Sequence, residues 1–208
     1  MQYIKKLTLC LLLLITFTSN ATLTNDEKIQ LFAQSNLKTK YVMIGDSITA
    51  QGVWSELLST PSVANRGISG ETSNQILNRI NGILKVKAQK AFILMGANDF
   101  SQRKTAEEVY ENYIKLVDAL KSNNTAAVIQ TTTRCNIDKQ PRWKTINEEI
   151  KKLNKMLQIY ASDNGIEFID LDSSLSDSKG LLDKYSPDGI HLNLAGFKKW
   201  SALIKEKM

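Results

Sequence analysis

Residues 41–49 read YVMIGDSIT, an apolar run that stops at a glycine and is followed by polar residues. A short run that is nearly continuous in apolar character predicts a β-strand buried on both faces. Similar runs occur at Val63–Asn65, where the signal is weaker, and at Ala91–Met95, Ala127–Gln130 and Glu167–Leu171. The chain is therefore predicted to contain five short strands.

Apolar residues recur at helical spacing between these predicted strands. The stripes are Ile76-Ile80-Ile83-Leu84, Val109-Tyr113-Leu116-Val117-Leu120, Ile146-Ile150-Leu153-Leu157-Tyr160 and Leu194-Phe197-Leu203. Thr105 and Glu108 form a capping box before the second stripe, Asn164-Gly165 ends the third, and Asn193 caps the last. A leading helix is expected over Asn25–Lys38. Alternating strands and helices predict an α/β fold, a three-layer α/β/α sandwich with a parallel sheet.

Length and composition restrict the function classes. The 208 residues suit one domain, and 42% hydrophobic with 23% charged residues fits a soluble globular protein. Two cysteines and one histidine exclude a disulfide scaffold, a Cys-rich zinc module and a His-rich metal site. The net charge of +6 comes without a dense basic stripe, so no nucleic-acid partner is expected.

The first 21 residues have the pattern of a secretory signal peptide. Lys5 and Lys6 precede an apolar stretch of 11 residues, Leu7–Phe17, and small residues at Ser19 and Ala21 predict cleavage after Ala21. Such a stretch is too short to span a bilayer, which takes roughly 20 residues. We expect an exported protein, periplasmic or extracellular in a bacterium, with one domain over residues 22–208 and no stable membrane insertion.

Polar residues capable of chemistry follow the predicted strands. Ser47 comes after the first strand and opens a helix, Gly67 and Gly70 lie in the loop after the second, and Asn98 follows the third. Taken singly, these are also typical of a helix cap, a plain turn and a turn-forming Asn-Asp pair. Because the carboxyl ends of parallel strands share one edge, together they predict a nucleophile with oxyanion donors.

Near the C-terminus the sequence Ser186-Pro187-Asp188-Gly189-Ile190-His191 supplies a base. Asp188 and His191 are three residues apart in a loop bent by proline and glycine. This spacing can bring the carboxylate to one imidazole nitrogen, which fixes the tautomer of the base. A lone surface histidine is the alternative interpretation, and the other segments favour the catalytic one.

With these residues in this order, the chain resembles the SGNH hydrolases, the GDSL-type esterase/lipase family. Its four blocks match at Ser47, Gly70, Asn98 and His191, and Gly70 is preferred to Gly67 because Gly-Glu-Thr fits the second block. The resemblance implies a flavodoxin-like five-stranded parallel sheet. It also implies Ser47 as nucleophile, His191 as base, Asp188 as its orienter, and an oxyanion hole of Ser47, Gly70 and Asn98.

The resemblance is strongest to the platelet-activating-factor acetylhydrolase-like and bacterial thioesterase/lysophospholipase branches. It implies a small-molecule or glycan ester substrate and needs no metal or cofactor. We expect a short-chain or carbohydrate O-acetyl esterase. The alternatives are a lysophospholipase/thioesterase, an acyltransferase and a non-catalytic glycan-binding module. The oligomeric state is left open.

Several other residues have side chains that could serve a site or the core. Trp54, Arg134 and Trp143 are candidates for lining the substrate site. Asp170 and Asp172 resemble a metal pair but lack further ligands nearby, which favours a structural role. Cys135 is expected to be an apolar filler rather than a nucleophile.

Overall fold

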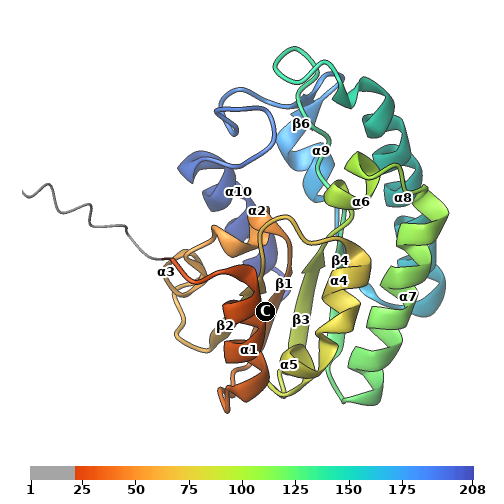
Figure 1. Ribbon diagram of the computed structural model, residues 1–208. Helices are drawn as coiled ribbons and strands as arrows, with labels where there is room; N and C mark the ends of the chain where they lie inside the picture. Colours follow the sequence, from red (N-terminus) through yellow and green to blue (C-terminus); the bar gives the residue numbers. More distant parts are fainter. Residues whose placement is uncertain (1–21) are drawn as a thin grey trace, which may run out of the picture.

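The computed structural model describes residues 22–208. The expected signal peptide, residues 1–21, lies outside the described residues. The centre is a five-stranded parallel sheet with strand order β2-β1-β3-β4-β5 (Figure 1). The strands are β1 (Tyr41–Gly45), β2 (Val63–Gly67), β3 (Lys90–Leu94), β4 (Ala126–Gln130) and β5 (Glu167–Ile169). All five predicted strands are present, and β5 ends two residues early.

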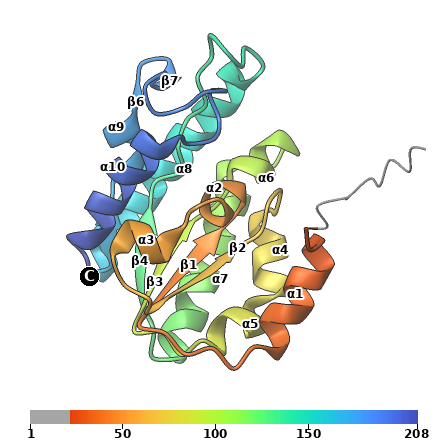
Figure 2. The same ribbon diagram turned by 90° about the vertical axis from the view of Figure 1, so that its left-hand side faces the viewer.

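Helices cover both faces of the sheet, so the predicted α/β/α sandwich is confirmed (Figure 2). The first face carries α4 (Ser73–Asn78), α5 (Ile80–Leu84), α6 (Ala97–Ser101), α7 (Ala106–Ser122) and α8 (Trp143–Asn164). The second carries α2 (Ser47–Ala50), α3 (Trp54–Leu58), α9 (Leu171–Leu175) and α10 (Leu194–Lys205). Helix α1 (Asn25–Gln34) packs beside α5, and a small antiparallel hairpin joins β6 (Ser176–Asp177) to β7 (Gly180–Leu181).

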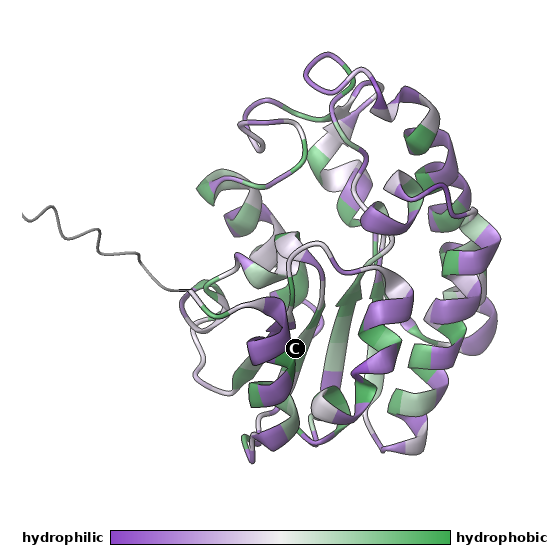
Figure 3. Ribbon diagram, viewed as in Figure 1, coloured by the Kyte–Doolittle hydropathy of each residue, from purple (hydrophilic) through white to green (hydrophobic). Residues whose placement is uncertain are grey.

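The two faces have separate apolar cores, because alternate residues of each buried strand point to opposite sides. Val42, Ile44 and Ile93 meet the helices of the first face. Met43 and Phe92 meet those of the second. Figure 3 shows this as hydrophobic strands between helices whose outer sides are polar.

The predicted helix boundaries rest on local hydrogen bonds. The Thr105 hydroxyl accepts from the Glu108 N–H, and the Glu108 carboxylate accepts from the Thr105 N–H in return. Gly165 ends α8 in the left-handed conformation with φ of 62°. Asn193 caps α10 by accepting from the Gly196 N–H at 3.0 Å. These three expectations are confirmed.

One predicted helix is divided in two. The stripe from Ile76 to Leu84 is interrupted at Arg79, whose φ of −106° and ψ of 17° are not helical. The Arg79 side chain forms a buried ion pair with Glu71 at 2.6 Å and donates to the carbonyl of Arg66 at 2.8 Å. This tertiary contact explains why the apolar periodicity continues while the backbone helix does not.

The leading helix is also shorter than expected, ending at Gln34 rather than Lys38. Helices α6 and α9 and the β6–β7 hairpin were not predicted. Within residues 22–208, none of the helices combines the length and the apolar character that crossing a bilayer requires.

Candidate active site

Ser47 lies where β1 turns directly into α2, at the carboxyl edge of the sheet. The Asp46 side chain caps α2 by accepting from the Ile48 N–H at 3.0 Å. Gly67 at the end of β2 allows α2 to approach closely, since a Cβ there would come within 2.4 Å of the Ala50 nitrogen. Close packing is thus sufficient to account for Gly67.

The single histidine reaches Ser47 from the far end of the chain. The Ser47 Oγ lies 3.2 Å from His191 Nε2, although the two residues are 144 positions apart. On the other side of the ring, His191 Nδ1 lies 2.8 Å from Asp188 Oδ2. With the Nδ1 proton directed at the carboxylate, Nε2 is free to accept the hydroxyl proton. The structure therefore brings Ser47, His191 and Asp188 together in the order that proton transfer requires.

The Asp188 carboxylate is held by its own loop. Its Oδ1 atom accepts from the N–H groups of Ile190 at 2.9 Å and of His191 at 2.8 Å. Partial burial raises the pKa of Asp188, but these bonds and the one from the His191 ring outweigh it and lower that pKa to about 2. Asp188 is therefore ionised wherever a neutral imidazole can act as a base.

A second loop supports this one and was not identified from the sequence. The Lys139 ammonium donates to the carbonyls of Ser186 at 3.0 Å and Pro187 at 3.2 Å. The Asn136 N–H donates to the carbonyl of Gly189 at 2.8 Å, where φ is 82°. The segment after β4 thus positions the loop that carries the histidine.

Three hydrogen-bond donors were expected beside Ser47. The backbone N–H groups of Ser47 and Gly70 donate to no acceptor among residues 22–208. The Asn98 side-chain amide donates to the Glu71 carbonyl at 3.0 Å and lies 3.5 Å from Asp46 Oδ2. Asn98 thus joins the Gly70 loop to the segment that carries Ser47.

Buried carboxylates lie behind these donors. Asp99 accepts from the Ser73 N–H at 2.8 Å and from the Ser73 hydroxyl at 2.7 Å, which ties α6 to α4. Burial raises the pKa of Asp99. Burial also raises the pKa of Asp46 to about 6, against the opposing effects of the Ile48 N–H and His191. The sequence could not show this network, because it depends on contacts between separate blocks.

The structure buries two of the three residues expected to line the substrate site. Trp54 is only 2% exposed, packs against Trp200 and donates to the Thr49 carbonyl. Trp143 is 5% exposed within the first core. Both indoles are therefore core residues, because their large apolar surfaces are more stable when buried.

Arg134, the third candidate, is held by a carboxylate of α9. Its guanidinium pairs with Asp172 at 2.6 Å. Asp172 also accepts from the Arg134 N–H at 2.8 Å, and Asp170 caps α9 by accepting from the Ser173 N–H. The two aspartates therefore have the structural roles expected of them. Over residues 22–208 no group of three His, Cys, Asp or Glu side chains is arranged to hold a metal ion.

Cys135 is a buried apolar residue, as expected. Its exposure is 2%, and burial raises the pKa of its thiol. A thiol in this state is a poor nucleophile.

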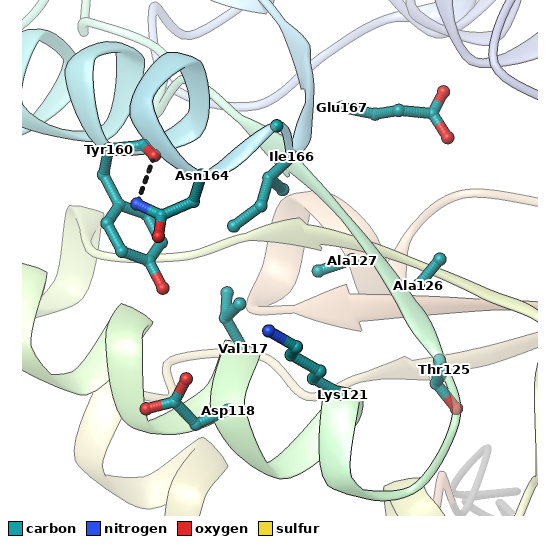
Figure 4. A pocket seen from close by; sticks show the side chains of 11 residues that line it. Val117, Asp118, Lys121, Thr125, Ala126, Ala127, Tyr160, Asn164, Ile166 and Glu167 are labelled. Carbon is teal, nitrogen blue, oxygen red and sulfur yellow. Dashed lines mark hydrogen bonds between the residues drawn. The ribbon is translucent and has the colours of Figure 1, made fainter.

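A separate cavity of about 290 Å³ lies at the opposite edge of the sheet (Figure 4). It is bounded by α7, α8 and the starts of β4 and β5, with Tyr160, Asp118 and Lys121 among its walls. The cavity lies at the amino ends of the parallel strands, whereas Ser47 lies at their carboxyl ends, so the two are remote from each other. It belongs to a different part of the surface from the Ser47–His191 pair.

A family model and a curated relative both match most of the chain. The family model for GDSL-like lipases/acylhydrolases matches residues 43–199. N-acylneuraminate cytidylyltransferase from Streptococcus agalactiae is 26% identical over 156 residues, which are 75% of this chain and 35% of that protein. The chain thus spans about a third of the length of the curated relatives it matches.

Solved structures share the fold. The lipase/acylhydrolase from Enterococcus faecalis is 25% identical with a TM-score of 0.71, covering 81% of this chain and 94% of that one. A variant of an acetyl-xylooligosaccharide esterase from Geobacillus is 17% identical with a TM-score of 0.68, covering 83% and 96% respectively.

Proposed function

Because the chain belongs to the GDSL-like lipase/acylhydrolase family and is an ester-cleaving hydrolase, we propose that it works as a serine esterase through an acyl-enzyme. Its preferred substrates are short-chain esters, in particular O-acetyl esters of a carbohydrate. The observation that carries the mechanism is the continuous contact from Ser47 Oγ through the His191 ring to Asp188, at 3.2 Å and 2.8 Å.

The proposed reaction proceeds in two steps. His191 Nε2 takes the proton of the Ser47 hydroxyl while Oγ attacks the acyl carbonyl carbon. Collapse of the tetrahedral intermediate releases the alcohol, which receives that proton from His191, and leaves an acyl-serine. Water, activated by the same nitrogen, then releases the acid. Asp188 stays ionised throughout and stabilises the imidazolium.

The oxyanion would be stabilised by the N–H groups of Ser47 and Gly70 and by the side-chain amide of Asn98. The two backbone groups have no acceptor among residues 22–208, so they are free to bind a developing negative charge. Asn98 Nδ2 carries a second proton besides the one directed to Glu71, and within residues 22–208 the other acceptor it meets is Asp46 Oδ2 at 3.5 Å. An oxyanion at hydrogen-bond distance would replace this long contact.

The polar surroundings of the site support a carbohydrate substrate. Gln140, from the loop after β4, donates one side-chain amide proton to the Asp188 carbonyl at 3.2 Å. An amide carries a second proton and an acceptor oxygen, which can form hydrogen bonds with sugar hydroxyls. An esterase named for acetyl-xylooligosaccharides has the same fold, so the fold accommodates that substrate class.

A lysophospholipase or thioesterase is the second candidate. Val53 and Leu194 are 62% and 65% exposed. They follow Ser47 and His191 closely in sequence. Val53 directly precedes α3 and Leu194 begins α10, and these two helices pack together through Trp54 and Phe197. An apolar rim of this kind would favour a longer acyl chain. We also propose that the protein is exported, on the strength of the pattern in residues 1–21.

Initial rates on p-nitrophenyl acetate, butyrate, octanoate and palmitate test the proposal. We expect activity on acetate that falls with chain length. Ser47→Ala should lower kcat by roughly 10⁶-fold, because the covalent route is lost. Ser55→Ala, an exposed serine on α3, is the matched control and should leave kcat unchanged. A maximum at octanoate or beyond would favour the second candidate. Equal rates for the unaltered protein and Ser47→Ala would contradict the serine mechanism.

A further inference from the structure

The loop that carries Gly70 is a tight turn. The Glu71 N–H lies 3.4 Å from the Ile68 carbonyl, which closes a four-residue turn over Ser69 and Gly70. Gly70 has φ of +80°, while Ser69 is not among the residues with positive φ. This is the type II form. Types I and II differ mainly by a half-turn of the central peptide, here the one that joins the Ser69 carbonyl to the Gly70 N–H.

The orientation of this peptide determines which side of the turn presents the Gly70 N–H and which side presents the Ser69 carbonyl. In a trans peptide the carbonyl and the N–H point in opposite directions. A half-turn would therefore exchange the Gly70 N–H for the Ser69 carbonyl. A carbonyl oxygen in place of a donor would repel a developing oxyanion.

Helix α1 contacts this peptide directly. The Asn25 side-chain amide donates to the Ser69 carbonyl at 2.9 Å, across 44 residues of sequence. Figures 1 and 2 show α1 lying along the edge of the molecule beside α4 and α5. A rotated peptide would turn the Ser69 carbonyl away from Asn25 and break this bond.

Two further contacts fix α1 in place. The Arg66 guanidinium, from the end of β2 just before the same loop, lies 4.4 Å from the centre of the Phe32 ring. Gly82 of α5 allows a close approach, since a Cβ there would come within 3.2 Å of the Phe32 backbone. Asn25 is thus presented to the loop by a helix that is itself anchored to α5 and β2.

We infer that Asn25 is a positioning residue for catalysis: by holding the Ser69 carbonyl, it keeps the Ser69–Gly70 peptide in the orientation that presents the Gly70 N–H to the oxyanion. This inference rests on the proposed function, in which the Gly70 N–H is an oxyanion donor. Asn25 acts through the peptide and does not touch the reacting atoms. Its effect is therefore on the transition state rather than on substrate binding.

The test compares Asn25→Ala and Asn25→Asp in the full mature chain on p-nitrophenyl acetate. One hydrogen bond corresponds to a decrease in kcat of about 2- to 12-fold for Asn25→Ala, with KM unchanged. Asn25→Asp should lower kcat further, because a carboxylate of the same shape repels the Ser69 carbonyl. Gln30→Ala, at an exposed position on α1, is the control for changes in the helix itself.

The outcomes separate the two proposals. A selective loss of kcat in both Asn25 variants, with melting temperatures equal to that of Gln30→Ala, supports the positioning role. A kcat equal to that of Gln30→Ala, or a loss expressed in KM, overturns it while the esterase proposal stands. If the unaltered protein shows no turnover that depends on Ser47, the proposed function fails and the positioning role fails with it.

Discussion

Asp46 and Asp188 lie on opposite sides of the Ser47–His191 pair, in environments that differ sharply. Asp46 is 3% exposed and sits between the end of β1 and α2. The Asp188 side chain is 46% exposed and belongs to the loop before α10. Their pKa values move in opposite directions, since burial raises that of Asp46 to about 6 and hydrogen bonds lower that of Asp188 to about 2.

The two halves of the candidate active site are held in place in different ways. The half that contains Ser47, Gly70 and Asn98 is attached to the carboxyl ends of β1, β2 and β3, and the carboxylates that support it, Asp46 and Asp99, are buried. The half that contains Asp188 and His191 is held by hydrogen bonds within one loop and from a neighbouring loop. The first therefore depends mainly on the packing of the fold, and the second on hydrogen bonds near the surface.

Asp188→Asn gives the largest expected effect and tests the exposed half. An amide at this position can donate to Nδ1 and so favours the tautomer that leaves Nε2 protonated and unable to accept the Ser47 proton. We expect kcat to fall by roughly 10⁴-fold. The melting temperature should fall modestly, because the hydrogen bonds that lower the pKa of Asp188 also stabilise the folded protein, while the half-exposed side chain is screened by solvent.

Asp183→Asn is the control for this prediction. Asp183 lies in the same loop and pairs with Lys139 at 2.9 Å, but does not touch the imidazole. It should retain nearly full activity. Similar losses in the two variants would mean that the whole loop, rather than the carboxylate on the ring, determines the rate.

Asn98→Ala gives the next largest effect and tests the buried half. Removing one side-chain donor to an oxyanion costs about 2.7–4 kcal/mol in the transition state, or 10²–10³ in kcat. Stability should fall as well, because the bond to the Glu71 carbonyl at 3.0 Å is lost. Gln102→Ala, at the exposed end of α6, is the control. Melting curves with kcat and KM measured in parallel would separate the two losses; an increase in KM alone would contradict the role of Asn98.

The contrast between the halves also explains what the sequence could predict. The fold could be predicted because burial on both faces leaves a continuous apolar run in each strand, as at Tyr41–Ile44. The pairing of Asp188 with His191 could be predicted because they are only three residues apart. The contact from Asn25 to Ser69 spans 44 residues and leaves no local pattern. Trp54 was ambiguous for a related reason, because an indole suits a core and a substrate pocket equally well.

Asp46→Asn gives the smallest expected effect and sharpens the comparison between the two carboxylates. Asparagine caps a helix as well as aspartate does, so the bond to the Ile48 N–H is preserved while the charge is removed. The pKa of Asp46 is raised from its usual 3.8 to about 6, so the folded protein holds this proton more tightly than the unfolded chain. The contribution of Asp46 to stability is therefore fully present below pH 4 and is lost as the pH rises to about 6.

Urea unfolding at about pH 4 and about pH 7.5 should show Asp46→Asn gaining stability relative to the unaltered protein as the pH is raised, by up to about 3 kcal/mol. The exposed Asp163, changed to Asn, should show no such gain. A difference that stays constant with pH would mean that Asp46 titrates alike in the folded and unfolded chains, and that its burial does not distinguish it from Asp188.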